Sequence, residues 1–488
     1  MKNSEELRQQ LRSINRKSYP AYKGLKGLYH FGNYILSIDH VQGDPFASPS
    51  HVSIQISHRD AGFPVEYYKD TLTGTTLCDY LTRQFEKQVS QYSFRAKGSG
   101  KSGLLTVSHC GQEILSRTAC EITEKGITAR FFVGFPANGR TINATELEKI
   151  LFDFLPVCIQ KSFFYSSLNA KELQNYIELA EDQEFIRQTL PAKNLCAFIA
   201  DGSILPRESG ISSRPMKASV PFTSPDSLRI SINLPHKGKI TGMGIPKGIT
   251  LIVGGGYHGK STLLNALELG VYNHIPGDGR EYVITDATAV KLRSEDGRFI
   301  KDVDISMFIN DLPNKKDTRC FSTLDASGST SQAAGIVESM EAGSHLFLLD
   351  EDTSATNFMV RDAFMQQVIQ REKEPITPFL ERAEDLYKKA GISTILVAGS
   401  SGAFFHIADT IIQMDNYVPK DITASVKKLC SQYPLPAVSV TDFQLPHSHR
   451  IMSRPAESSK RLRHNSRGNH SDSGAAKPER LKTRISGT

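Results

Sequence analysis

The sequence lacks any long apolar run. Even the richest segment, 150–159, is broken by Asp153 and Pro156, so nothing approaches the roughly 18 apolar residues of a membrane-spanning helix. The N-terminus has no apolar signal core, and Glu5 and Glu6 argue against both a secretory signal and a transit peptide. These absences exclude a membrane-spanning transporter.

Cysteine is sparse and scattered. The chain has seven cysteines and no C-x-x-C pair. This pattern predicts neither a disulfide framework nor a zinc site, and it is typical of reduced thiols. We therefore expect a cytoplasmic protein.

Outside the C-terminal tail, the sequence has no excess of positive charge. The net charge is +6, yet segment 450–488 alone holds ten Lys or Arg residues against three acidic residues, a balance of +7. Such a tail either remains solvated or contacts phosphates, as in nucleic acid. With 488 residues, we expect three parts: an N-terminal α+β domain (1–165), an α/β domain (166–445) and the basic tail (446–488).

The clearest motif is ITLIVGGGYHGKSTLLNAL, residues 249–267. The run Ile249 to Val253 predicts a buried strand, and the leucine spacing from Ser261 onward predicts a helix. Between them the residues fit G-x-x-x-x-G-K-[ST], in which backbone amides hold phosphates and the helix N-terminus adds positive charge. Lys260 is expected to reach the β- and γ-phosphates, and Ser261 to bind Mg²⁺. The predicted phosphate-binding residues are Gly254, Gly255, Gly256, Tyr257, His258, Gly259, Lys260, Ser261 and Thr262.

Two downstream segments carry related chemistry. Residues 325–332, DASGSTSQ, place small residues and hydroxyls before a predicted helix, which taken alone indicates an N-cap. Residues 345–352, HLFLLDED, predict a strand that ends in acids. There Asp350 is suited to bind the same Mg²⁺ as Ser261, and Glu351 to orient or deprotonate the attacking water.

Two other segments resemble ligand loops less well. The glycine loop 97–103 contains GSGKS, but it lacks the first glycine of the motif, and the residues after it predict a strand. We interpret it as a turn, or as a basic loop against a phosphate backbone. The loop expected over 201–225 carries Arg207 and Arg214, and loops of this length are usually functional or disordered. Its place just upstream of the phosphate-loop strand favours nucleotide contact over disorder.

The remaining periodicity predicts mixed secondary structure. In the first region, strands over 104–108, 118–122 and 127–133 predict an antiparallel sheet, and a helix over 144–154 is expected to end near Pro156. From 166 to 445, alternating strands and helices predict one α/β unit with a largely parallel sheet and its ligand loops at one edge. A helix is expected from Phe358 to about Ile369.

The order of these motifs resembles the ATP-binding cassette superfamily. More closely, GGGYHGKSTLL, ASGSTSQAA and LLDEDTSATNFMVRD, with HVQGDPFASPS in the first region, resemble the predicted ABC-class ATPases. That family includes a kinetoplastid mitochondrial RNA-binding ATPase, and the resemblance covers about residues 10–445. It implies a P-loop ATPase fold, ATP with Mg²⁺ as ligands, and RNA or another nucleic acid as client. It also implies a head-to-tail homodimer, in which Ser327 and Gly328 complete the partner's nucleotide site.

The sequence departs from the superfamily at one functional position. Where ABC transporters place a histidine after the last sheet strand, this chain has Ser400 and Ser401, and His406 lies further on.

We expect an ATPase with Glu351 and Lys260 as catalytic residues. The alternative is a nucleotide-gated scaffold or nucleic-acid-binding module with negligible turnover. A P-loop kinase is disfavoured because it gives segment 325–332 no role.

Overall fold

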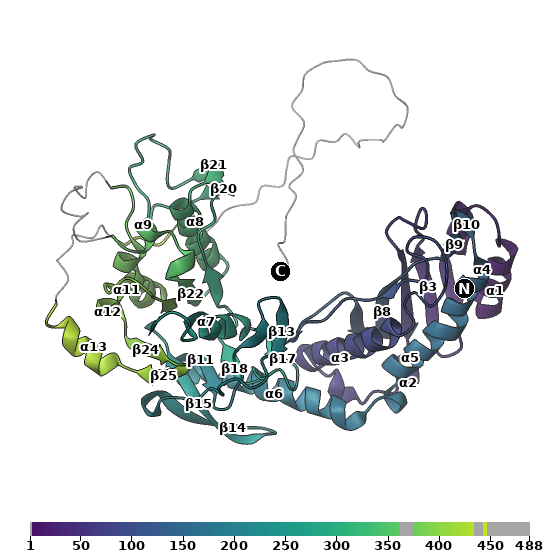
Figure 1. The fold of residues 1–488 in the computed structure, drawn as a ribbon, viewed down its shortest axis with the longest axis horizontal. Coiled ribbons are helices and arrows are strands. Elements are labelled where there is room, and N and C mark those ends of the chain that lie inside the picture. Colours follow the sequence, from purple (N-terminus) through teal and green to yellow (C-terminus); the bar gives the residue numbers. More distant parts are fainter. Residues whose placement is uncertain (1, 362–373, 434–442, 447–488) are drawn as a thin grey trace, which may run out of the picture. The chain divides into compact units, whose positions relative to one another are not determined.

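The computed structural model describes residues 2–361, 374–433 and 443–446 (Figure 1). The basic tail from residue 447 onward lies outside the described residues, as does the helix expected near 358–369 beyond residue 361. In the described part of that helix, α9 (Thr356–Met359) stops before the extended Val360. Among the helices in the described ranges, none combines the length and apolarity needed to cross a bilayer.

A seven-stranded sheet organises the N-terminal region. Its order is β1-β2-β3-β4-β8-β5, with β7 also on β8, and all pairs except β1–β2 are antiparallel. The antiparallel sheet predicted here is thus confirmed. Its strands are β1 (Lys2–Asn3), β2 (Gly27–His30), β3 (Ile35–His40), β4 (Ser50–Ile56), β5 (Leu105–Thr106), β7 (Cys120–Thr123) and β8 (Gly126–Val133).

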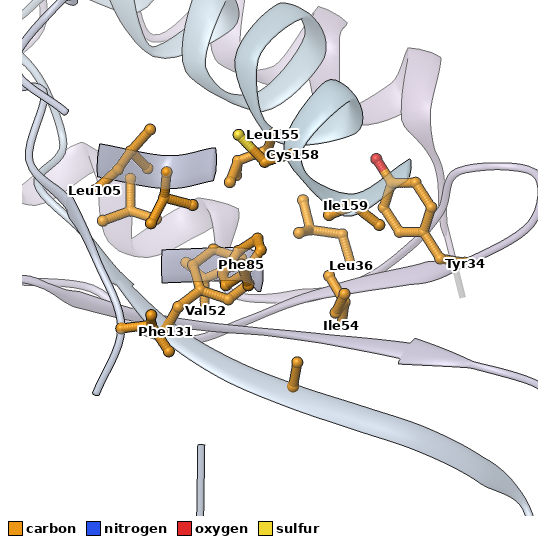
Figure 2. Close-up of a cluster of buried hydrophobic side chains, with 14 of the residues drawn as sticks. Tyr34, Leu36, Val52, Ile54, Phe85, Leu105, Phe131, Leu155, Cys158 and Ile159 are labelled. Carbon is orange, nitrogen blue, oxygen red and sulfur yellow. The ribbon is translucent and has the colours of Figure 1, made fainter. Parts of the chain in front are cut away.

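Helices cover one face of this sheet, and the core lies between them. Helix α3 (Thr71–Ser90) begins directly after Asp70, which forms a capping box with Thr73. Figure 2 shows Phe85 of α3 and Ile159 of the helix α5 (Leu155–Phe163) directed at residues of β3, β4 and β8. Phe85 packs edge-on against Phe131 of β8. This burial of aromatic and branched side chains is the main stabilising contribution of the region.

The prediction that a helix ends near Pro156 is wrong. Helix α4 (Ala144–Glu148) passes into a π-helical turn (Lys149–Phe154), which continues into α5 through Pro156. Leu155 donates its amide to the carbonyl of Ile150, and Pro156 occupies the first turn of α5. The π turn changes the hydrogen-bond register at that point, so the amide missing from proline is tolerated.

The glycine loop 97–103 has a packing role. A Cβ on Gly100 would lie 2.5 Å from the carbonyl oxygen of Pro45, and Lys101 donates its amide to that oxygen at 2.8 Å. The strand β5 follows the loop, where a nucleotide loop requires a helix. The interpretation of this segment as a turn is confirmed.

A second sheet in this region is antiparallel, which corrects the expectation of a single parallel unit; three of its strands precede the phosphate loop in the chain and one follows it. It has the order β14-β15-β11-β18, and a short turn joins β14 to β15, as only antiparallel strands allow. Helix α6 (Ala170–Ala192) packs on it. The strands are β11 (Leu195–Ala200), β14 (Arg229–Leu234), β15 (Gly238–Pro246) and β18 (Val283–Thr285).

The central sheet follows the predicted parallel arrangement. Its order is β19-β22-β23-β16-β24-β25, and only the β24–β25 pair is antiparallel. Its strands are β16 (Ile249–Val253), β19 (Val290–Leu292), β22 (Leu346–Asp350), β23 (Ser393–Val397), β24 (Thr410–Asp415) and β25 (Val418–Asp421). The helices of this part are α7 (Lys260–Leu269), α8 (Gly328–Glu341), α11 (Phe379–Ala390), α12 (Phe404–Ile407) and α13 (Thr423–Cys430). A hairpin of β20 (Arg298–Val303) and β21 (Phe321–Ala326), absent from the prediction, leads into α8.

Candidate active site

The phosphate-loop motif forms the expected strand, loop and helix. The loop leaves β16 at Gly254, and α7 begins at Lys260. Gly254 has φ +139°, and a Cβ there would collide with the carbonyl oxygen of Met414. Gly259 has φ +98°, so both positions require glycine for their backbone conformation. Gly255 and Gly256 are exposed, so their backbone is open to a ligand.

The first turn of α7 presents unsatisfied amides. Its N-cap is Gly259, which has no side chain to cap the helix. Ser261 is exposed and Thr262 is half-buried in this turn. Free amides at the positive end of a helix, with a hydroxyl beside them, are suited to bind an anion and its cation.

Lys260 lies over the loop. Its Nζ donates to the carbonyl oxygens of Gly254 at 2.7 Å and Gly255 at 2.9 Å. The ammonium group is therefore held at the loop by the backbone that surrounds it, next to the amides of α7.

His258 and Tyr257 differ in role. The Nδ1 atom of His258 accepts the amide of Asn416 at 2.9 Å, and its carbonyl accepts the amide of Tyr417 at 3.2 Å. His258 thereby ties the loop to the turn between β24 and β25. Tyr257 has φ +65° and is 99% exposed, so its ring is directed to solvent.

Asp350 ends β22, two strands from β16 in the sheet. Its side chain is buried and accepts the amide of Asp352 at 3.2 Å. Burial raises the pKa of Asp350, while the positive charges of Lys291 and Lys260 act in the opposite direction. In the sheet, only β23 lies between β22, which ends at Asp350, and β16, which leads into the phosphate loop.

Glu351 follows directly and is held from the next strand. Its Oε2 accepts the amides of Gly399 at 2.7 Å and Ser400 at 3.0 Å, and its Oε1 accepts the Ser400 hydroxyl at 2.6 Å. Burial opposes ionisation, yet these hydrogen bonds outweigh it and lower the pKa of Glu351. The sequence showed Ser400 only as a departure from a family pattern, and its contact with Glu351 was not predicted.

Ser327 and Gly328 lie apart from the phosphate loop. Ser327 is the exposed N-cap of α8, and its hydroxyl lies 3.0 Å from that of Thr330. The nearest side chains to a Cβ on Gly328 would be those of Asp296, Ser294 and Ala355, at 3.3–3.5 Å. Within the part of the chain that the structure describes, no hydrogen bond joins Ser327 or Gly328 to residues 254–262.

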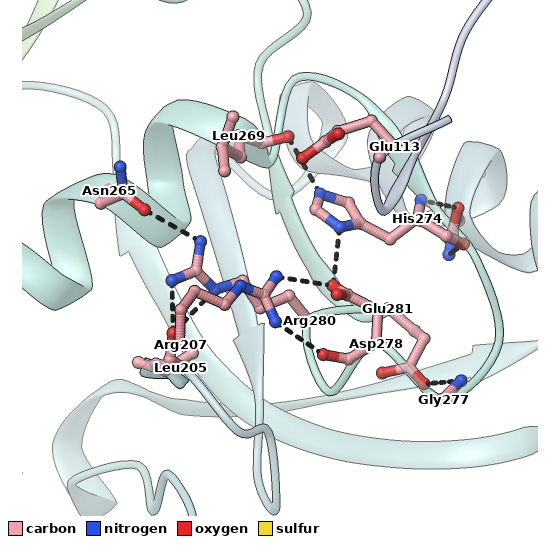
Figure 3. A network of polar contacts seen from close by, with 12 residues as sticks. Glu113, Leu205, Arg207, Asn265, Leu269, His274, Gly277, Asp278, Arg280 and Glu281 are labelled. Carbon is pink, nitrogen blue, oxygen red and sulfur yellow. Dashed lines mark hydrogen bonds and ion pairs between the residues drawn. The ribbon is translucent and has the colours of Figure 1, made fainter. Parts of the chain in front are cut away.

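A buried ionic network lies at the other end of α7 (Figure 3). Asp278 accepts from Arg207 at 2.9 Å and lies 2.7 Å from Nδ1 of His274. The other ring nitrogen of His274 lies 3.1 Å from the carbonyl oxygen of Leu269, the last residue of α7. Both ring nitrogens of His274 therefore face oxygen atoms.

Arg280 extends this network to the middle of α7. It is 1% exposed, and it donates to the Leu205 carbonyl and to Oδ1 of Asn265 at 3.1 Å. Burial, followed by repulsion from Arg207, lowers the pKa of Arg280 to about 10. The network therefore holds α7 at its middle and its C-terminal end. No spacing of residues in the sequence predicted this network.

The expectation for segment 201–225 is corrected here. The segment holds the hairpin of β12 (Arg207–Ser209) and β13 (Ser212–Pro215), where one long loop was predicted. Arg207 forms its ion pair with Asp278, with only 11% of its side chain exposed, so it is not available to a nucleotide. Short strands of polar residues such as these carry no apolar alternation by which they could be predicted.

Comparison with known proteins assigns the chain. Residues 169–448 match the P-loop domain of the ABC ATPase family, and residues 4–166 match the family described as the N-terminal part of ATPases of the ABC class. The chain belongs to the ABC-class ATPase family. The recognition made from the sequence motifs and the α/β P-loop fold are thus confirmed.

One curated relative of this ABC-class ATPase is the uncharacterized protein MJ1628 of Methanocaldococcus jannaschii. It is 31% identical over 266 residues, which are 52% of this chain and 58% of the relative, so the match spans less than two thirds of that protein. Among solved structures, MJ1267, an ATP-binding cassette of an ABC transporter, is 13% identical with a TM-score of 0.27, over 40% of this chain and 88% of its own. A bacterial Atm1-family ABC exporter with ATP bound is 13% identical with a TM-score of 0.28, over 50% of this chain and 43% of its own.

Proposed function

We propose that this chain binds ATP with Mg²⁺ and hydrolyses it. The observation that carries the proposal is the strand order β22-β23-β16, because β22 ends at Asp350 and β16 leads into the glycine loop and the bare N-terminus of α7. The amides of residues 254–262 and the ammonium of Lys260 bind the phosphates. Glu351 accepts a proton from the attacking water.

The residues present also fit the metal. Ser261 and Asp350 offer hydroxyl and carboxylate oxygens, which are the donors that Mg²⁺ prefers. Burial of Asp350 raises its pKa and so favours a bound cation that neutralises it. When bound with ATP, Mg²⁺ offsets the charge that develops on the phosphates.

The proposal extends to a homodimer. Ser327 and Gly328 lie at the N-terminus of α8, where Ser327 is exposed and makes no side-chain capping bond. A second copy arranged head to tail brings these amides and hydroxyls to the phosphates of its partner's nucleotide. Their separation from residues 254–262 in one chain supports this division of the site.

We also propose RNA or another nucleic acid as the client. The support is the +7 balance of segment 450–488, which lies outside the described residues.

The seven cysteines, all free, agree with a reducing cytoplasm. A nucleotide-gated scaffold with negligible turnover is the alternative, and the presence of Glu351 argues against it.

Steady-state ATP hydrolysis tests the catalytic part. Glu351→Gln is expected to keep ATP binding and to lower kcat by about 10²–10⁴-fold, because it removes the general base. Lys260→Ala is expected to weaken ATP binding. Asp352→Asn, one residue further on, is the matched control and should retain turnover. Equal, normal turnover in all three variants contradicts the assignment, and turnover absent from the unmodified chain favours the scaffold.

Sedimentation and gel shifts test the partners. Glu351→Gln with ATP is expected to accumulate dimer, whereas the variant without ATP is not. RNA, single-stranded DNA and duplex DNA are titrated against the full chain and a chain lacking 450–488, over a salt series. Affinity that falls steeply with salt and depends on 450–488 supports the client. Lack of binding at low salt removes the nucleic-acid proposal.

A further inference from the structure

The segment after β23 lies against Glu351 because of strand register. In the parallel pair β22–β23, Asp350 lies opposite Val397. The residue that follows Asp350 therefore emerges beside Ala398 and the turn that begins at Gly399. This places Gly399 and Ser400 within reach of the Glu351 carboxylate without any special loop conformation.

The contact occupies both carboxylate oxygens. One oxygen receives two backbone amides, from Gly399 and Ser400, and the other receives the Ser400 hydroxyl at 2.6 Å. Three donors from two consecutive residues fix the plane of the carboxylate. The amides are available from any residue at position 400, but the third bond requires a hydroxyl.

We propose that Ser400 is a positioning residue for Glu351, whose hydroxyl orients the carboxylate toward the attacking water. This inference rests on the proposed function. In hydrolysis, the water oxygen forms a bond to the γ-phosphorus, the bond from that phosphorus to the ADP oxygen breaks, and Glu351 takes the water proton. The orientation of its lone pairs therefore decides how well the proton is accepted.

The test compares Ser400→Ala, Ser400→Thr and the unmodified chain in ATP hydrolysis. Ser400→Ala is expected to lower kcat by about tenfold, as for loss of one hydrogen bond to a charged group. Its KM for ATP should stay unchanged. Ser400→Thr keeps the hydroxyl and should restore kcat. Ser431→Ala, an exposed serine on the far end of α13, is the matched control.

The outcomes separate this inference from the proposed function. If the unmodified chain hydrolyses ATP and Glu351→Gln does not, the proposed function holds. A kcat in Ser400→Ala equal to that of the unmodified chain then overturns the role of Ser400 alone. If the unmodified chain does not hydrolyse ATP, both proposals are overturned. Circular dichroism and ATP binding by Ser400→Ala show whether a loss of kcat reflects misfolding.

Discussion

Replacement of Asp278 by alanine is expected to disrupt the buried ionic network that holds α7 in place. Asp278 is fully buried, and its carboxylate is shared by Arg207 and His274, whose side chains are 11% and 0% exposed. Asp278→Ala leaves these two groups without their acceptor. It also leaves Arg207 close to Arg280, and the two repel each other.

The magnitude follows from the burial of the partners. Removing one member of a buried ion pair costs about 3–5 kcal/mol, because the remaining charge is desolvated and uncompensated. At 1.36 kcal/mol per factor of ten, this corresponds to roughly 10²- to 5 × 10³-fold more frequent local opening. Asp278→Asn keeps the shape but not the charge, so its effect is expected to be smaller.

Hydrogen exchange measured by mass spectrometry reports this opening directly. Peptides covering 203–216 and 260–283 should exchange faster in Asp278→Ala, while peptides covering β4 should not change. Asp226→Ala, which removes an exposed acid paired with Arg229, is the control. Unchanged exchange over 260–283 in Asp278→Ala would refute the view that this network anchors α7.

The same network predicts a pH dependence. Burial opposes the charge on Asp278, but His274 and Arg207 outweigh it and lower the pKa of Asp278. A carboxylate whose pKa is lower in the folded than in the unfolded chain stabilises the fold above its unfolded pKa, about 3.9, and loses that contribution as the pH falls through the folded pKa. The difference in urea midpoint between the unmodified chain and Asp278→Asn should therefore shrink as the pH falls below about 4.

Two further predictions concern the phosphate loop and the thiols. Gly254→Ala should lose ATP binding, because its Cβ would meet the Met414 carbonyl at a backbone φ of +139°. Gly343→Ala, at φ +82° with no atom within 4 Å, is the control for backbone strain alone. Normal ATP binding by Gly254→Ala would contradict the proposed need for glycine in the phosphate loop. A thiol reagent should modify the exposed Cys320 first and the half-buried Cys430 next, while the five buried cysteines react only after unfolding; mass spectrometry of the labelled peptides checks the order, and early labelling of any buried thiol would contradict it.

The phosphate loop and the strand that ends at Asp350 could be predicted from the sequence, because residues close to them in the chain determine them. The phosphate loop is set by glycines within six residues and by the strand and helix on either side. The apolar strand before Asp350 likewise determines where that carboxylate emerges. Parallel packing of such strands follows from their continuous apolar runs, which need cover on both faces.

The predictions failed where long-range contacts decide the structure. Arg207 looked available to a nucleotide, but its partner Asp278 lies 71 residues away. The hydrogen bonds between Ser400 and Glu351 span 49 residues and depend on strand register, which no local pattern encodes. A helix end was predicted near Pro156, because no residue type in the sequence indicates the π turn that precedes it.

The π turn before Pro156 also fixes how the helix tolerates changes in length. Each residue of an α-helix turns its successors by about 100°, and Cys158 and Ile159 are both buried in the N-terminal core. Deletion of one residue from Lys149–Phe154 would rotate that face away from the sheet unless the helix repaired its register. The π turn thus sets the rotation of α5 about the helix axis relative to α4, so that both helices direct their apolar sides into one core.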